Sequence, residues 1–180
     1  MRLAESWQKA EIPGPKKALI ITKPEIVSAL IKRSKRPILI VGHEAAKVKL
    51  DEGELLLDYL IRLAKLTNMT VIATAHVVKD FVAREFQPDA WMPVVDIANR
   101  LQDPDWKGLD GKGSYDLAIL TGMQYYLQWV ILSALKHFSS GLKTISLDRF
   151  YQPNASWSFP NISFEEWRTN LKVIEEKLRG

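Results

Sequence analysis

Four apolar runs of this chain each end in polar or glycine residues, and these are the residues whose types and spacing could do chemistry. A glycine at a strand end lets a phosphate approach the backbone, while imidazole, hydroxyl and carboxyl groups can hold a ligand. We take Gly42, His43, Thr74, His76, Thr121 and Gly122 as candidate cofactor-binding residues, and we assign no catalytic residue and no metal ligand. The same crevice would also include Glu44, Ala75, Met123 and, further out, Asp148.

Gly42 raises the question of a phosphate-binding turn, because it directly follows the apolar run "ILIV". The dinucleotide fingerprint needs three closely spaced glycines and a helix that starts at the turn. The segment "GHEAAKVKLDEG" has only the first glycine in place, and we expect the next helix to begin after Asp51. Asp51 and Glu52 would repel a phosphate there, although Lys47 and Lys49 offer positive charge. We favour a turn glycine, with a looser nucleotide site as the open alternative.

His43 and His76 each follow a predicted strand, so the two imidazoles could approach each other if those strands are neighbours. A metal site needs further ligands, and Glu44 is the only acidic residue nearby in sequence. The chain has no cysteine, which excludes disulfides, thiolate nucleophiles and cysteine-bound metal clusters. We therefore interpret both histidines as turn residues at strand ends.

The elements that must position these residues are strands that alternate with helices. Continuous apolar runs predict buried strands at 38–41, 69–75, 115–122 and 143–148. Apolar periodicity predicts helices that start near Thr22, after Asp51 (ending at Asn68), at 79–84, at 93–102, at 124–138 and after Ser163. The starts at Thr22 and Ser163 rest on capping boxes with Glu25 and Glu166.

This alternation predicts an α/β fold with three αβα layers and a doubly wound, mainly parallel sheet. The strand at 38–41 should be central, and a crossover to 115–122 on its other side creates a switch point. Ligands in such sheets bind beyond the carboxyl ends of the strands at that point. We expect residues 1–18, which include Trp7 and Ile12, to form an N-terminal arm and residues 19–180 to form one Rossmann-like domain.

The composition fits a soluble globular protein, with 47% hydrophobic and 26% charged residues. No apolar stretch is long enough to span a bilayer and the N-terminus lacks the apolar core of a secretory signal, so we expect a cytoplasmic protein. The net charge is +4, and the densest basic cluster is "KRSKR" at 32–36. That cluster lies where a helix should give way to a strand, and cations favour helix C-termini. We expect neither a nucleic acid nor a membrane partner.

The segment "RFYQPNASWSFPN" at 149–161 is rich in aromatic residues and has two interpretations. Tyr151, Trp157 and Phe159 could fold back over the edge of the sheet as core. They could equally form an exposed anchor, because aromatic side chains dominate the energetics of protein interfaces. The sequence leaves these two interpretations open.

Several of these stretches, taken together, resemble a known protein family. "IPGPK", "IKRSKRPILIVGHEA", "DLAILTG" and above all "YQPNASWSFPN" followed by "EEW" make the chain resemble the epsilon subunits of the archaeal acetyl-CoA decarbonylase/synthase complex. The resemblance covers essentially the whole chain. It implies a fold like the NAD/FAD-binding domains related to deoxyhypusine synthase. It carries over no catalytic residue.

The resemblance also implies a partner and a role. The expected partner is the carbon monoxide dehydrogenase alpha subunit, which carries the nickel–iron–sulfur chemistry and interconverts CO and CO2 within a larger complex that cleaves and makes acetyl-CoA. The epsilon subunit would stabilise this component or help electrons pass to FAD, which is therefore the candidate cofactor. Isolated, the chain is expected to self-associate or to bury its arm. The alternative is a stand-alone oxidoreductase that depends on FAD or NAD.

Overall fold

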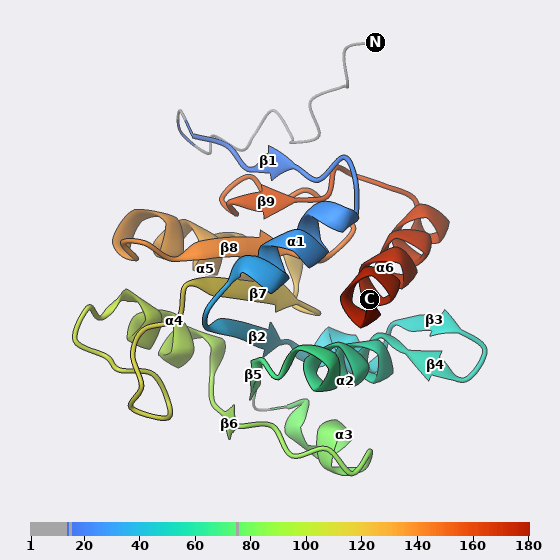
Figure 1. The fold of residues 1–180 in the computed structure, drawn as a ribbon, viewed down its shortest axis with the longest axis horizontal. Coiled ribbons are helices and arrows are strands. Elements are labelled where there is room, and N and C mark those ends of the chain that lie inside the picture. The colour runs from blue at the N-terminus through green and yellow to red at the C-terminus, as the bar shows by residue number, and fades with distance from the viewer. Residues whose placement is uncertain (1–13, 15, 75) are drawn as a thin grey trace.

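The computed structural model describes residue 14, residues 16–74 and residues 76–180. Trp7 and Ile12 of the predicted arm, and the crevice residue Ala75, lie outside the described residues. Figure 1 shows a central sheet with helices on both of its faces. The α/β class and the three αβα layers are therefore confirmed.

The central sheet has seven strands in the order β1-β9-β8-β7-β2-β5-β6, and each neighbouring pair is parallel. β2 lies between β5 and β7, so the predicted switch point is present. The strands are β1 (Leu19–Ile20), β2 (Pro37–Val41), β5 (Thr70–Ala73), β6 (Ala90–Trp91), β7 (Leu117–Thr121), β8 (Lys143–Ser146) and β9 (Trp157–Ser158).

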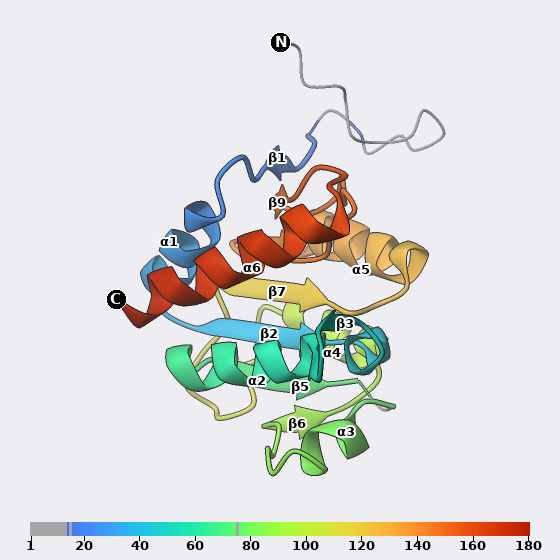
Figure 2. The ribbon, with the colours of Figure 1, turned by 90° about the vertical axis from the view of Figure 1, so that its right-hand side faces the viewer.

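The helices divide between the two faces of the sheet. In Figure 1, α1, α2 and α6 lie in front of the sheet and α5 lies behind it. Figure 2 shows α6 crossing over the sheet beside α1. The helices are α1 (Glu25–Arg33), α2 (Leu56–Thr67), α3 (Val78–Val82), α4 (Val94–Gln102), α5 (Tyr125–Phe138) and α6 (Phe164–Arg179), and a 3-10 turn, η1, spans His43–Ala46.

Alternate residues of β2 supply the two cores, because successive side chains of a strand point to opposite faces. Leu39 and Val41 belong to the core under α1, α2 and α6, and Ile38 and Ile40 to the core under α4 and α5. All four side chains are completely buried. A strand that is apolar on both faces belongs in the middle of a covered parallel sheet, which is where β2 lies.

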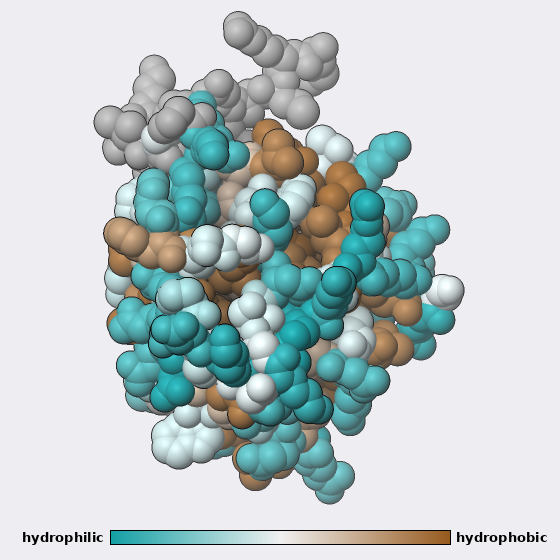
Figure 3. Space-filling view, turned by 60° about the vertical axis from the view of Figure 1, so that its left-hand side comes forward, coloured by the Kyte–Doolittle hydropathy of each residue, from teal (hydrophilic) through white to brown (hydrophobic). Residues whose placement is uncertain are grey.

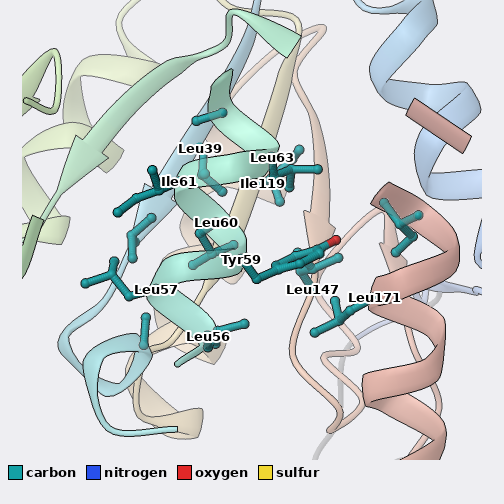
Figure 4. Packing of buried hydrophobic residues seen from close by; sticks show 14 of the residues in the cluster. Leu39, Leu56, Leu57, Tyr59, Leu60, Ile61, Leu63, Ile119, Leu147 and Leu171 are labelled. Carbon is teal, nitrogen blue, oxygen red and sulfur yellow. The ribbon is translucent and has the colours of Figure 1, made fainter. Parts of the chain in front are cut away.

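Tyr59 of α2 is buried in the core where α2 and α6 pack on the sheet. Figure 4 shows its ring among leucines, with the hydroxyl pointing towards the helix that carries Leu171. The Tyr59 hydroxyl is buried without a hydrogen-bond partner among the described residues. Burial raises the pKa of Tyr59 well above its ordinary value, so the phenol stays neutral.

The start of α2 differs from its prediction. Residues Lys49–Asp51 and Glu54–Leu55 form a small antiparallel hairpin, β3 and β4, and the helix begins only at Leu56. Gly53 adopts a φ of 80° in the connecting turn, a conformation that glycine reaches without steric cost. The Leu55 N–H then donates to Asp58 Oδ2 over 2.7 Å and so caps the helix.

The start of α1 also differs. The helix begins at Glu25 with Pro24 as its N-cap residue, and no side chain accepts a capping hydrogen bond there. The capping box predicted from Thr22 and Glu25 is therefore absent. By contrast, Ser163 caps α6 as predicted, because its side chain accepts a hydrogen bond from the Glu166 N–H.

Candidate functional site

Gly42 packs against Gly122 at the carboxyl ends of β2 and β7. A Cβ atom added to Gly42 would lie 2.1 Å from the carbonyl oxygen of Gly122, closer than any real contact. A Cβ added to Gly122 would in turn lie 2.8 Å from the backbone nitrogen of Ala45, and Gly122 has a φ of 70°. Glycine is needed at both positions for the close approach of two backbones, which supports the favoured interpretation of Gly42 as a turn glycine.

Three backbone N–H groups of this turn, those of Gly42, Glu44 and Ala45, are already engaged. Gly42 N–H donates to the Thr121 carbonyl and Glu44 N–H donates to the Gly122 carbonyl, both over 2.9 Å. Ala45 N–H donates to the Gly42 carbonyl over 3.2 Å. A phosphate at a glycine-rich turn is held by free N–H groups. The Gly42 turn therefore does not fit the pyrophosphate of a dinucleotide.

Asp51 and Glu52 do not take the position that was predicted for them at the start of a helix beside this turn, because they belong to the β3–β4 hairpin. Asp51 instead forms ion pairs with Arg168 and, over 2.8 Å, with Lys172 of α6. Hydrogen bonding from Lys172 is the main reason why the pKa of Asp51 lies below its ordinary value. These ion pairs tie the hairpin to α6.

His43 and His76 do approach each other, as their positions after neighbouring strands predicted. Their ring centroids are 6.2 Å apart in an edge-to-face arrangement. His43 Nε2 lies 2.7 Å from Glu44 Oε1, and Lys47 Nζ reaches the same oxygen over 3.0 Å. Within the described residues, no group of three or more histidine, aspartate or glutamate side chains is arranged to hold a metal ion.

The six residues predicted from sequence as cofactor-binding do not all lie at one site. Gly122 lines a cavity of about 550 Å³ at the carboxyl ends of β7 and β8. Thr121 lies beneath the cavity wall and donates its hydroxyl to Asp148 Oδ1 over 2.8 Å. Gly42, His43, Thr74 and His76 do not border this cavity.

The cavity wall comes from η1, α2, the start of α5 and α6 as well as from the loops after β7 and β8. Its apolar part includes Met123, Tyr125, Phe164 and Trp167, and its polar part includes Glu44, Gln128, Asp148, Arg149 and Gln152. Sequence reasoning placed Asp148 at this edge but missed Gln152 and Trp167. The sequence did carry one signal for Gln152, which is a polar residue inside an aromatic segment. If such a segment is buried, its polar side chains need hydrogen-bond partners, from the protein or from a ligand.

Asp148 is the most perturbed acid of this cavity. Its Oδ1 accepts hydrogen bonds from the Thr121 hydroxyl and, over 3.0 Å, from the Gly122 N–H. Its Oδ2 is enclosed and has no hydrogen-bond partner among the described residues. Burial raises the pKa of Asp148 to about 6, and the hydrogen bonds from Gly122 and Thr121 offset only part of that rise.

The aromatic segment at 149–161 folds mainly as core. Tyr151 and Phe159 are 3% and 1% exposed, while Trp157 is half-buried in the short strand β9, which lies between β1 and β8. The Tyr151 hydroxyl donates to the Ala18 carbonyl over 2.8 Å, which ties the segment to β1. Of the two interpretations left open, the core interpretation is correct for these residues. Phe150, 45% exposed, is the exception.

The basic cluster at 32–36 is organised by acids of its own chain. Asp116 accepts hydrogen bonds from the Ser34 hydroxyl, from Lys35 N–H over 2.8 Å and from Arg36 N–H over 2.9 Å. The Arg36 guanidinium pairs with Asp110 over 2.6 Å. These contacts fix the turn from α1 into β2, as expected for a cluster at a helix end.

None of the described helices is both long and apolar enough to cross a membrane.

Comparison with known proteins agrees with the resemblance. The chain is 38% identical over 159 residues to the acetyl-CoA decarbonylase/synthase complex subunit epsilon of Methanothrix soehngenii, covering 88% of this chain and 81% of that protein. It is 34% identical over 170 residues to the subunit of the same name from Methanothermobacter thermautotrophicus, covering 93% and 92%. Residues 2–178 match the family described as CO dehydrogenase beta subunit/acetyl-CoA synthase epsilon subunit. The chain therefore belongs to this family.

Proposed function

We propose that this chain is the epsilon subunit of an acetyl-CoA decarbonylase/synthase complex, and that it stabilises the carbon monoxide dehydrogenase component without an active site of its own. Its partner would be the large alpha subunit. The observation that carries the proposal is the family match over nearly the whole chain, to relatives that are named as epsilon subunits of that complex.

The outer face of α5 supports a docking role. A surface helix normally has one apolar stripe, whereas α5 carries apolar residues on its outer side as well. Ile131, Leu132 and Leu135 face the core, yet Tyr126 is 68% exposed and Val130, one turn further on, is 54% exposed. Tyr126 and Val130 thus put two exposed apolar side chains one turn apart on α5, and exposed apolar side chains that cluster favour a protein partner. Figure 3 shows one face of the molecule, on which hydrophobic residues gather in the upper part among hydrophilic ones.

The segments expected to contact the partner differ from those that the sequence suggested. The arm and the aromatic segment seemed the natural anchors in the sequence, but Tyr151 and Phe159 are buried and cannot reach a partner. The arm's Trp7 and Ile12 lie outside the described residues. The outer face of α5, defined by Tyr126 and Val130, takes the place of the aromatic segment in the proposal.

A role in passing electrons to FAD is the second part of the proposal for this family. It would require a flavin to bind this chain or its junction with the alpha subunit. The engaged N–H groups around Gly42 argue against the usual pyrophosphate site, so we assign no residue to a flavin. The same observation weighs against the alternative of a stand-alone FAD- or NAD-dependent oxidoreductase.

Co-expression with the alpha subunit tests the stabilising role. We expect the two chains to purify together through size-exclusion chromatography, and the CO-oxidising activity of the alpha subunit to survive heating longer when this chain is present. Chains that elute separately, or an unchanged half-life of that activity, would rule out the proposal.

Calorimetric titration separates the cofactor roles. FAD and NAD are titrated into this chain alone and into the co-purified complex. Binding of FAD to the complex alone would support a site completed at the interface and a role in electron transfer. Tight binding together with turnover by the isolated chain would favour the stand-alone oxidoreductase. Absence of binding in both samples would leave the stabilising role.

A further inference from the structure

We propose that the cavity at the carboxyl ends of β7 and β8 binds a small organic cation, one that carries N–H donors on an apolar body. The inference does not depend on the subunit role. The cavity encloses about 550 Å³, which lies within the range of small-molecule sites. We take a free small molecule as the occupant, because the volume matches that of small-molecule sites.

Two buried acceptors at the cavity lack partners. Asp148 Oδ2 and Gln152 Oε1 both have no hydrogen bond within the described part of the chain. Gln152 is only 1% exposed, and its amide is held in place because Nε2 donates to the Tyr125 carbonyl over 3.0 Å. A buried acceptor without a partner costs about 1–3 kcal/mol. A ligand that brings N–H donors would remove this cost at both atoms.

Other polar groups of the wall are already committed within the protein. Gln128 Nε2 donates to the Leu120 carbonyl and to the Ser146 hydroxyl, each over 3.2 Å. Trp167 Nε1 donates to the Leu147 carbonyl over 2.8 Å. These donors are turned to the protein and not to a ligand. The two buried acceptors without a partner, Asp148 Oδ2 and Gln152 Oε1, therefore set the hydrogen-bonding preference that we propose for the cavity.

The charge of the wall favours a cation. Of the two acids of the wall, Glu44 is already paired with Lys47 over 3.0 Å, so the charge available to a ligand is that of Asp148. Arg149 is the basic residue and holds its guanidinium 4.1 Å from the Phe150 ring centroid. Asp148 is bound by a hydroxyl and an N–H but by no cationic side chain among the described residues. Since burial raises the pKa of Asp148 only to about 6, the carboxyl is mostly charged at neutral pH without a counter-ion.

The aromatic part of the wall suits the body of such a ligand. Phe164 and Trp167 of α6 stack edge to face with ring centroids 5.8 Å apart, and both line the cavity. Aromatic faces attract cations and also bury apolar surface. A planar amidinium on an aromatic ring combines the two preferences of the cavity.

Three probes of equal shape and different charge test the proposal on the intact chain. Benzamidine is the cation, benzamide the neutral isostere and benzoate the anion, and each is titrated by calorimetry at pH 7.5. We expect benzamidine to bind about tenfold or more tightly than benzamide, as charge-assisted hydrogen bonds imply, and benzoate not to bind. Equal binding of the three probes, preference for benzoate, or no binding of benzamidine would overturn the proposal.

A pair of variants locates the binding. Asp148→Asn keeps the shape and the acceptor for Thr121 but removes the charge, and should weaken benzamidine binding about tenfold or more. Asp96→Asn makes the same chemical change at an exposed position of α4 and should leave binding unchanged. If both variants bind benzamidine like the wild type, the cation site is not this cavity. The comparison of the three probes on the wild type stands even if Asp148→Asn folds poorly.

Discussion

Gly42 and Gly122 lie so close that a Cβ atom on the first would come within 2.1 Å of the carbonyl oxygen of the second. The two residues end the neighbouring strands β2 and β7, and the Gly42 N–H donates to the Thr121 carbonyl immediately before Gly122. This contact explains a glycine at the end of "ILIV" without a nucleotide. The glycine serves the packing of one strand end against another.

The first prediction is that Gly42→Ala destabilises the fold severely. The added methyl group meets backbone atoms, which cannot swing away as a flexible side chain can. Overpacking in a tight core costs about 1–3 kcal/mol and sometimes more, and we expect at least about 3 kcal/mol here. The free energy of unfolding from urea denaturation measures the effect.

Gly180→Ala is the matched control for this substitution. It makes the same chemical change where nothing lies within 4 Å, so the free energy of unfolding should stay unchanged. Should Gly42→Ala prove as stable as this control, the strand ends would have to be further apart than described.

The central strands were predictable because burial on both faces leaves a continuous apolar run, as in Ile38 to Val41. The short strands β1, β6 and β9 have two residues each, too few to show any period, and were missed. The hairpin at Lys49–Leu55 was mistaken for the start of a helix. Its turn depends on Gly53, and its position depends on the pairing of Asp51 with α6, which lies more than a hundred residues away.

The site was predictable only as an edge of the sheet. The switch-point rule correctly brought the ends of β2, β5 and β7 together, and with them His43 and His76. It could not show that Gly122 would fill the space over Gly42, because that contact joins residues eighty positions apart. The residues that line the cavity at Asp148 come from five separate segments of the sequence, so no local sequence pattern could predict this cavity.

Asp116 provides the second prediction. Its carboxylate accepts hydrogen bonds from the Ser34 hydroxyl and from the N–H groups of Lys35 and Arg36. Asp116→Ala leaves these donors without their partner and should lower the free energy of unfolding by about 2–3 kcal/mol. Asp105→Ala, on an exposed turn, should change it by less than about 0.5 kcal/mol. Equal losses in the two variants would show that Asp116 does not anchor the turn.

The third prediction concerns pH. Burial raises the pKa of Asp148 to about 6 in the folded protein, while an unfolded aspartate titrates near about 3.9. The folded state therefore binds this proton more tightly. The stability that it contributes is complete below pH about 4 and is lost as the pH rises through about 6.

Asp148→Asn removes this titration and supplies the comparison. Between pH 4 and 7, the wild type should lose about 1–3 kcal/mol of unfolding free energy relative to the variant. Glu44 and Arg149, the other charged groups of the cavity, are present in both proteins and cancel in the difference. Urea denaturation at pH values across this interval measures it. A difference that is independent of pH would mean that Asp148 is not buried as described.

The last prediction places the partner on the outer face of α5. Val130 and Val82 are equally exposed, at 54%, but Val130 belongs to α5 and Val82 to α3 at the other edge of the sheet. A glutamate in an apolar interface must lose its hydration without a partner charge, so Val130→Glu should weaken binding to the alpha subunit about tenfold or more. Val82→Glu should leave binding unchanged, and neither variant should lower the melting temperature much, because both side chains face solvent. Binding measured by interferometry on the immobilised alpha subunit decides the question, and a stronger loss for Val82→Glu would move the docking surface from α5 to α3.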